Sequence, residues 1–189
     1  MTDAGGRFNH PRMHRLFVAV RPPGPIRNLL VDAMDDSADF RWQTDEQLHI
    51  TLRFIGEVER PLANDLASAF TRIRAEPFQL SITGVGRFEQ RNGGALWAAV
   101  EPKAPLAALA AKVERACQET GLEPERRAYH PHITLARWKG RRTREVQDFL
   151  ERRRDLVSEP FTVTEFILFE SRLSKHGAYY EPAATYPLA

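Results

Sequence analysis

The tetrapeptide His-Ile-Thr-Leu occurs twice in the 189-residue chain, beginning at His49 and again at His132. In a strand, successive side chains point to opposite faces, so the His and Thr of each copy share one face, about 6.5–7 Å apart. The Ile and Leu of each copy face the other way and need an apolar core to cover them. Each copy therefore predicts a rigid strand that presents one imidazole and one hydroxyl, His49 with Thr51 and His132 with Thr134.

Two such couples in one cleft could carry out acid–base chemistry on a phosphodiester. An imidazole gains or loses a proton near neutral pH, so a neutral ring can take a proton from the attacking oxygen while a protonated ring gives one to the leaving oxygen. Thr51 and Thr134 could donate hydrogen bonds to the non-bridging oxygens, where charge develops in the transition state. The residues alone do not say which histidine is the acid. The simpler alternative is two structural or surface histidines in an accidental repeat.

The segments around these motifs indicate an α+β fold. Strand-like patterns cover residues 15–20, 48–56, 78–88, 94–100, 130–138, 161–171 and 176–188. Apolar residues at helical spacing predict helices over residues 26–34, 62–73, 105–117 and 143–150, the last with Thr143 as its N-cap. Several strands are neighbours in sequence, which favours antiparallel sheets over a doubly wound parallel sheet. The order of elements repeats once, and each half contains one tetrapeptide.

Composition places the chain among ordinary globular proteins. Hydrophobic residues make up 42% and charged residues 28%, and no apolar run is long enough to span a membrane. The first residues lack the apolar segment of a secretory signal, and Cys117 is the single cysteine, so an internal disulfide is excluded. We expect a cytoplasmic monomer without membrane association, with a flexible tail over residues 1–14 and a single domain over residues 15–189.

The net charge is only +2, but Lys and Arg outnumber Asp and Glu in the segment 139–154. One interpretation is the solvated face of a helix. The alternative is a basic patch that attracts a polyanion.

Beyond this pattern, "HITLRFIG" and "HITLAR" resemble the paired H-x-T-x motifs of the 2H phosphoesterase superfamily, and more closely its RNA 2′,3′-cyclic phosphodiesterase branch, once called 2′–5′ RNA ligases. "RLFVAVRPP" is similar to the opening strand of that family, and "PHITLARW" to its second motif. "FILFESRLSKHGAYYEPAATYPL" is similar to its closing segment, in which a Ser-x-Leu is followed by a Gly and a Tyr. The resemblance covers roughly residues 15–188.

The resemblance implies a bilobal fold in which two antiparallel sheets flank a central cleft, with helices on the outside. It implies hydrolysis of a terminal RNA 2′,3′-cyclic phosphate to a 2′-phosphomonoester, with weak reverse ligation and without a metal or other cofactor. In this family-based assignment His49 is the general acid for the leaving 3′ oxygen and His132 the general base for water. Thr51, Thr134 and Arg137 would hold the phosphate.

The positions that follow the motifs need separate treatment. Arg137 is an odd number of residues away from His132 and Thr134, so a regular strand would place it on the opposite face. A bulge or the strand end could bring it back to the face of the motif. Arg53 is in phase with the first motif. Phe54 is expected in the core, because regular alternation places it on the same face as Ile50 and Leu52.

Three alternatives remain open from the sequence. His130 and His132 have a spacing found in metal sites, although a third ligand such as His49 or His176 would be needed. The chain could instead be a nucleotide-binding module that does not turn over its ligand. It could also hydrolyse a small cyclic phosphate, such as an ADP-ribose cyclic phosphate, in place of RNA ends.

Overall fold

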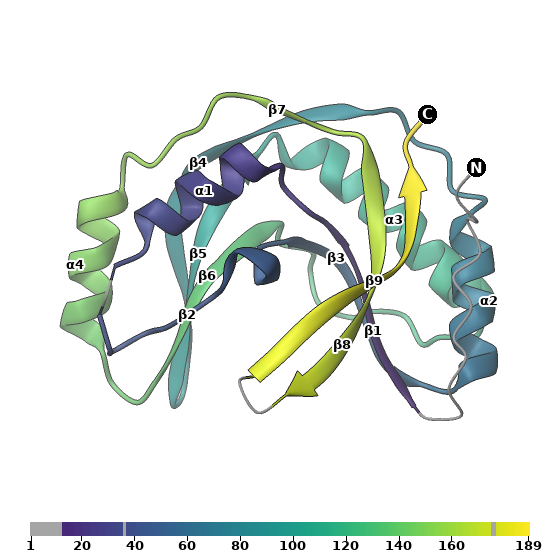
Figure 1. The fold of residues 1–189 in the computed structure, drawn as a ribbon, viewed down its shortest axis with the longest axis horizontal. Coiled ribbons are helices and arrows are strands. Elements are labelled where there is room, and N and C mark those ends of the chain that lie inside the picture. Colours follow the sequence, from purple (N-terminus) through teal and green to yellow (C-terminus); the bar gives the residue numbers. More distant parts are fainter. Residues whose placement is uncertain (1–12, 36, 175–176) are drawn as a thin grey trace.

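The two tetrapeptides lie on neighbouring strands of one antiparallel sheet (Figure 1). The computed structural model describes residues 13–35, 37–174 and 177–189. The strands in this part of the chain are β1 (His14–Val20), β2 (Arg41–Trp42), β3 (Ile50–Val58), β4 (Phe78–Gln90), β5 (Gly93–Glu101), β6 (His132–Lys139), β7 (Phe161–Val163), β8 (Glu165–Ser174) and β9 (Gly177–Pro187). The helices are α1 (Gly24–Ala33), α2 (Arg60–Phe70), α3 (Lys103–Glu119), α4 (Thr143–Arg153) and the short 3-10 helix η1 (Asp45–Gln47).

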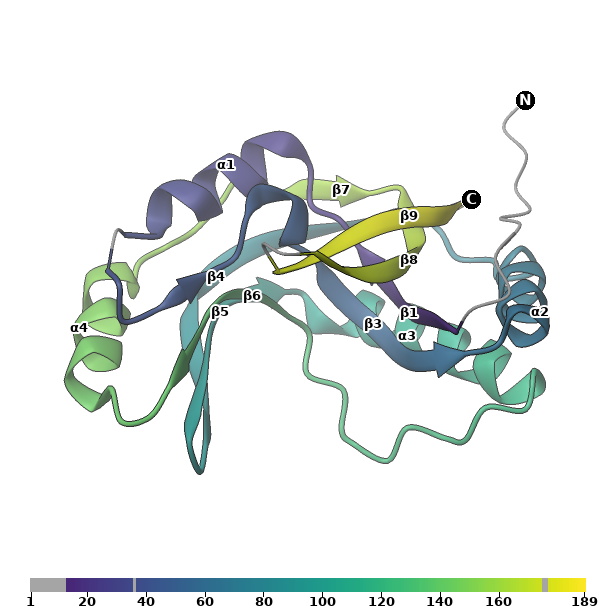
Figure 2. The ribbon, with the colours of Figure 1, turned by 60° about the horizontal axis from the view of Figure 1, so that its bottom comes forward.

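The strands follow the order β7-β4-β5-β6-β3-β1-β8-β9, with β2 paired to β6, and each of these pairings is antiparallel. The α+β class is confirmed. The expectation of two separate sheets is wrong, because β3 and β6 pair where Ile50 lies opposite Ile133 and so join the two halves. The resulting sheet is strongly curled (Figure 2).

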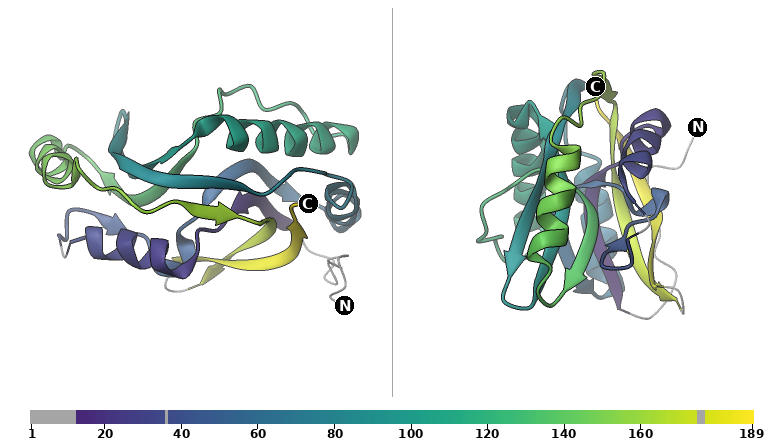
Figure 3. Two further views of the ribbon diagram at one scale, coloured as in Figure 1. Left: turned by 90° about the horizontal axis from the view of Figure 1, so that it is seen from above. Right: turned by 90° about the vertical axis from the view of Figure 1, so that its left-hand side faces the viewer.

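One hydrophobic core contains buried residues from the sheet and from all four α-helices. The Ile and Leu of both tetrapeptides belong to it, as their alternation predicts. Helices α1 and α4 lie over one half of the molecule and α2 and α3 over the other (Figures 1 and 3). Helix α3, which precedes the second motif in the chain, packs against α2 and against the strand of the first motif, β3.

The other face of β1 carries a smaller apolar cluster. Phe17 and Ala19 are buried there with Ile167 and Phe169 of β8. Val18, which lies between Phe17 and Ala19 in the strand, belongs to the main core. This second face is the one that bears the polar side chains of the motifs, because Ala19 lies opposite Thr51 in the register of β1 and β3.

The remaining segments largely follow the predicted elements, with local differences. The predicted strand over residues 161–171 is two strands, β7 and β8, separated at Thr164. Helix α4 has Arg142, not Thr143, at its N-cap position, and no side chain caps it. The sequence did not predict β2 or η1. Of the expected tail, residues 1–12 lie outside the described residues, and His14 begins β1. In the described part of the chain, no helix is both long and apolar enough to cross a membrane.

Both motif strands have a bulge at the same position of the tetrapeptide. On β3, Thr51 and Arg53 face consecutive residues of β1, so Leu52 is the extra residue. On β6, Thr134 and Ala136 face consecutive residues of β5, so Leu135 is the extra residue. A bulge of one residue reverses the alternation beyond it. The residues that follow each motif therefore exchange faces.

Candidate active site

The register of β3 and β6 brings the two motifs together. Ile50 opposite Ile133 places His49 beside Thr134, and Thr51 beside His132, on the same face of the sheet. His49 and His132 are then diagonal neighbours, a cross-strand relation of about 7–8 Å in a regular sheet. The positive charge of His132 contributes to the lowered pKa of His49, which agrees with this closeness. The four side chains are therefore neighbours on one face of the sheet.

The His49 ring is fixed by its own loop and by two aromatic rings. Its Nδ1 lies 2.6 Å from the backbone oxygen of Gln47. The ring centroids of Phe17 and Tyr180 lie 4.9 Å and 5.4 Å from that of His49. The Gln47 side chain also donates a hydrogen bond of 2.6 Å to the backbone oxygen of Ala178 on β9, the strand that carries Tyr180. Gln47 thus ties the loop before His49 to the strand that packs on it.

His132 has the same kind of support. Its Nδ1 lies 2.6 Å from the backbone oxygen of His130. The ring centroids of Phe88 and Trp97 lie 4.9 Å and 6.2 Å away. Trp97 needs Gly86 on the neighbouring strand, because a Cβ at that position would stand 2.3 Å from the indole ring. The absence of a side chain at Gly86 therefore gives room for the ring that packs on His132.

These contacts select one tautomer for each ring. A backbone carbonyl accepts hydrogen bonds and cannot donate them, so the Nδ1 of each histidine carries hydrogen. In the neutral ring, Nε2 is then the nitrogen that can accept a proton. In the charged ring, Nε2 is the nitrogen that can give one to a substrate. Neither ring depends on a carboxylate to hold its orientation, because a carbonyl two residues earlier does so.

The cleft lowers the pKa of both imidazoles. Burial is the main cause and lowers the pKa of His49 to about 4, with further contributions from the charges of His132, Arg137 and Arg21. Burial is also the main cause of the lowered pKa of His132, to which Arg137 contributes. The hydrogen bonds to the backbone carbonyls act in the opposite direction, because they favour the charged rings. At neutral pH both rings are mainly neutral in the empty cleft.

The two threonines lie half-buried beside the histidines. Within the part of the chain that the structure describes, neither Thr51 nor Thr134 makes a side-chain hydrogen bond. Both hydroxyls are therefore available as donors to a ligand in the cleft.

Arg137 faces the same side of the sheet as the motif side chains. Its alternation is corrected by the bulge at Leu135, after which Arg137 lies opposite Ala95 of β5. The side chain is exposed, and its charge acts on the pKa of both His49 and His132. The guanidinium group is thus placed where it could meet an anion between the rings.

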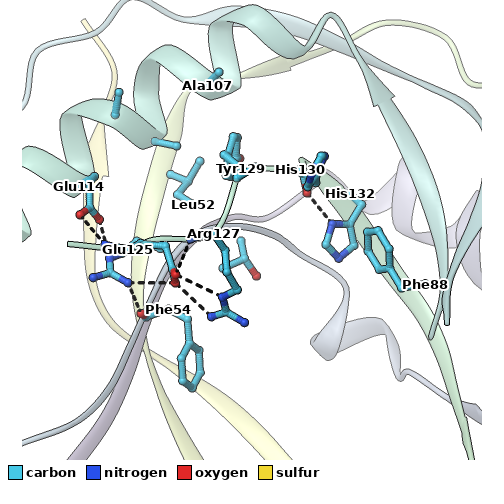
Figure 4. Close-up of a pocket in the computed structure, with 15 residues that line it drawn as sticks. Leu52, Phe54, Phe88, Ala107, Glu114, Glu125, Arg127, Tyr129, His130 and His132 are labelled. Carbon is cyan, nitrogen blue, oxygen red and sulfur yellow. Dashed lines mark hydrogen bonds and ion pairs between the residues drawn. The ribbon is translucent and has the colours of Figure 1, made fainter. Parts of the chain in front are cut away.

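Arg53 and Phe54 each lie on the sheet face opposite to the one that the sequence predicts. Because of the bulge at Leu52, Arg53 turns toward α3. Its Nε pairs with Glu114 of α3 at 2.6 Å, and its Nη1 pairs with Glu125, in the segment after α3, at 3.3 Å. Figure 4 labels both glutamates. Phe54 is 42% exposed and lies opposite Phe17 of β1, on the face that carries His49. The expectation that Phe54 belongs to the core is therefore wrong, and Arg53 is committed to ion pairs away from the phosphate space.

A cavity of about 750 Å³ adjoins the second histidine. It lies between β3, α3 and the segment before β6, and Figure 4 shows its lining residues. Thr51 and His132 stand at its edge toward the motifs, and Phe54, Phe88 and Tyr129 contribute aromatic surface. The cavity extends the cleft on the His132 side.

The basic segment after the second motif is largely neutralised. Four of its arginines form ion pairs with carboxylates: Arg142 with Asp39, Arg144 with Asp148, Arg152 with Asp35, and Arg154 with Asp155. These pairs favour the interpretation of residues 139–154 mainly as a solvated helix and its flanks.

The metal alternative gains no support from the side chains that the structure describes, in which no three His, Cys, Asp or Glu residues are grouped to hold an ion. The suggested third ligand His176 lies outside the described residues.

The sequence did not reveal the aromatic rings that hold the histidines. Phe17, Tyr180, Phe88 and Trp97 come from four different strands, and none has a fixed spacing from the motif that it supports. The nearest available signal was Gly86, whose missing side chain makes room for Trp97 on the neighbouring strand.

Known proteins share this sequence pattern and fold. A sequence profile of the 2'-5' RNA ligase superfamily matches residues 7–174. The RNA 2',3'-cyclic phosphodiesterase of Aeropyrum pernix is 35% identical over 140 residues, which cover 72% of this chain and 80% of that protein. The protein of the same name from Archaeoglobus fulgidus is 30% identical over 176 residues, which cover 88% of this chain and 96% of that protein.

Solved structures give the same result. The crystal structure of E. coli LigT complexed with NADP+ matches with a TM-score of 0.77 and 26% identity, covering 94% of this chain and 99% of that one. The resemblance inferred from the two H-x-T motifs is confirmed. The chain belongs to the 2′-5′ RNA ligase superfamily of 2H phosphoesterases.

Proposed function

We propose that the protein hydrolyses the 2′,3′-cyclic phosphate at RNA 3′ ends to a 2′-phosphomonoester, with His49 and His132 as the acid–base pair. The observation that carries this proposal is the diagonal placement of two imidazoles on one sheet face, each held through Nδ1 and each keeping Nε2 for the substrate. Relatives named RNA 2',3'-cyclic phosphodiesterase support the choice of substrate.

The reaction uses both rings in turn. Neutral His132 accepts a proton from water at Nε2 as the water oxygen attacks phosphorus. The bond from phosphorus to the 3′ oxygen breaks, and protonated His49 gives its Nε2 proton to that oxygen. The 2′ oxygen keeps the phosphate. Exchange with solvent then returns the proton to His49 and removes it from His132, which restores the starting state.

Three further side chains stabilise the phosphate as charge builds on its non-bridging oxygens. The Thr51 and Thr134 hydroxyls donate from opposite corners of the site. Arg137 adds a positive charge from the end of the second motif, and its planar guanidinium can donate two hydrogen bonds to one phosphate.

The low pKa values imply that a proton enters with the substrate. In the empty cleft the pKa of His49 is about 4, so the ring holds little proton at neutral pH. An anionic phosphate between the rings favours the charged form of an imidazole and raises its pKa. The active state therefore forms when the phosphate and one proton are both bound.

Hydrolysis of an oligonucleotide ending in a 2′,3′-cyclic phosphate tests the proposal. We expect a 2′-phosphate product, identified by its resistance to an enzyme that removes 3′-phosphates only. His49→Ala and His132→Ala should each lower the rate at least about 10²-fold, the scale of a lost general acid or base. Thr51→Ala and Thr134→Ala should cost less, because both proton transfers remain. Full activity in either histidine variant, or binding without turnover by the wild-type protein, would contradict the mechanism.

A further inference from the structure

Three cations continue the active-site face beyond the second motif. After the bulge at Leu135 the register of β5 and β6 is regular, so Arg137 and Lys139 share one face. Arg41 of β2 lies directly opposite Arg137 in the next strand. All three side chains are exposed. We call Arg41, Arg137 and Lys139 the basic row.

No described residue neutralises the basic row. Among the described residues, none of its three members has a carboxylate partner. The nearby carboxylate of Asp39 pairs with Arg142 at 3.0 Å. Two arginines directly opposite each other on neighbouring strands repel, which makes this arrangement unfavourable unless an anion lies between them. The placement of Arg41 opposite Arg137 therefore favours binding of an anionic ligand and does not itself stabilise the fold.

Helix α4 gives the contrast. Its exposed arginines Arg144 and Arg152 pair with Asp148 and Asp35, at 3.9 Å and 2.7 Å. These two helix arginines are therefore paired, whereas the three cations of the basic row have no carboxylate partner among the described residues.

We infer that the basic row leads the single-stranded RNA away from the active site, with Arg137 at the cyclic phosphate and Arg41 and Lys139 binding backbone phosphates on its 5′ side. This inference rests on the proposed function. A cyclic phosphate closes the 3′ end, so the chain can leave the site in the 5′ direction only. Successive side chains on one strand face are about 6.5–7 Å apart, a spacing that lets Arg137 and Lys139 reach different phosphates. Cations that contact backbone phosphates fix the position of a chain without reading its bases.

The aromatic cavity at the other end of the cleft agrees with this path. It adjoins His132, the proposed base, so it lies on the side from which water attacks. The basic row begins at Arg137, beyond Thr134, which lies beside His49 in the register. The departing ribose oxygen and its chain therefore lie on the side of the proposed acid.

Salt dependence tests the basic row. The value of kcat/KM is measured for a short oligonucleotide with a 2′,3′-cyclic phosphate and for a 2′,3′-cyclic mononucleotide, over a range of KCl concentrations. Each phosphate contact of a single strand contributes about −0.7 to the slope of log affinity against log salt. The oligonucleotide should give a steeper slope than the mononucleotide. The double variant R41Q/K139Q should flatten the oligonucleotide slope by about 1.4, while mononucleotide turnover stays within about twofold of the wild type, since Arg137 is retained.

The matched control is R144Q/R152Q, which removes the same charge from α4. It should keep the wild-type slope for the oligonucleotide. Equal flattening in both double variants, or no flattening in R41Q/K139Q, would overturn the basic row while leaving the proposed function intact. Failure of the wild-type protein to hydrolyse either substrate would overturn the proposed function itself. Circular dichroism spectra confirm that both variants are folded.

Discussion

The burial of His49 has a measurable effect on folding stability. In the folded protein its pKa is about 4, against 6.5 for an unperturbed histidine, mainly because burial disfavours the charged ring. The unfolded chain therefore takes up a proton at a higher pH than the folded protein does. Stability from this difference is complete above pH 6.5 and is lost as the pH falls toward 4. Replacing His49 by Gln removes the titrating group and should remove this part of the pH dependence.

The size of the effect follows from the two pKa values. Each pH unit between them corresponds to about 1.4 kcal/mol, so at pH 5 the wild-type protein loses about 2 kcal/mol relative to pH 8 through this group alone. Below pH 4 the loss reaches about 3 kcal/mol. The pKa of His132 is lowered as well, so His132→Gln should act with the same sign.

Urea denaturation at pH 8 and pH 5, followed by tryptophan fluorescence, measures the difference. The free energy of unfolding of His49→Gln should fall less between the two pH values than that of the wild type, by about 2 kcal/mol. Arg144→Gln on the exposed face of α4 is the control and should follow the wild type. A parallel loss of stability in wild type and His49→Gln would refute the claim that this half-buried ring is held neutral.

Four further outcomes follow from the site. The pH profile of kcat/KM should be bell-shaped with its maximum below pH 6.5, because the rings of the free enzyme titrate there. The profile of kcat should extend to higher pH, because bound phosphate raises the pKa of the rings. Equal profiles would contradict proton uptake with the substrate. Gly86→Ala should lower kcat about 10²-fold by displacing Trp97, whereas Gly24→Ala, which meets no neighbour within 4 Å, should have wild-type kinetics. Gln47→Ala should lower kcat several-fold, since it loosens the strand that carries Tyr180 but keeps the backbone oxygen that orients the His49 ring; an unchanged kcat would show that this tie is dispensable. EDTA should leave the rate unchanged, and recovery of lost activity by added Zn²⁺ would contradict the two-imidazole mechanism.

The alternation of the tetrapeptides was enough to predict the motif strands and the faces of His49, Thr51, His132 and Thr134. It failed immediately after each motif. No residue type marks a bulge at Leu52 or Leu135, because the strain and pairing that create it come from the neighbouring strand.

The joining of the two halves into one sheet also escaped prediction. It depends on a single registered pair between β3 and β6 in the described residues, Ile50 with Ile133, and sequence periodicity does not report which strands pair. The charge count of residues 139–154 left two interpretations open for a similar reason. Two of the carboxylate partners, Asp35 and Asp39, lie far away in the chain and come close only in the folded protein.

The identical bulges also bear on which bond is cut. The local two-fold relation between the tetrapeptides, taken alone, would accept a cyclic phosphate in two opposite orientations and release either ribose oxygen. The relation ends two residues after each Leu, where one copy presents Phe54 and the other presents Arg137 on the same face. This difference distinguishes the two ends of the site, so we expect residues outside the repeat to contribute to the choice of the bond that is cut. Exchanging these two side chains should scramble the ratio of 2′ to 3′ products before it abolishes cleavage.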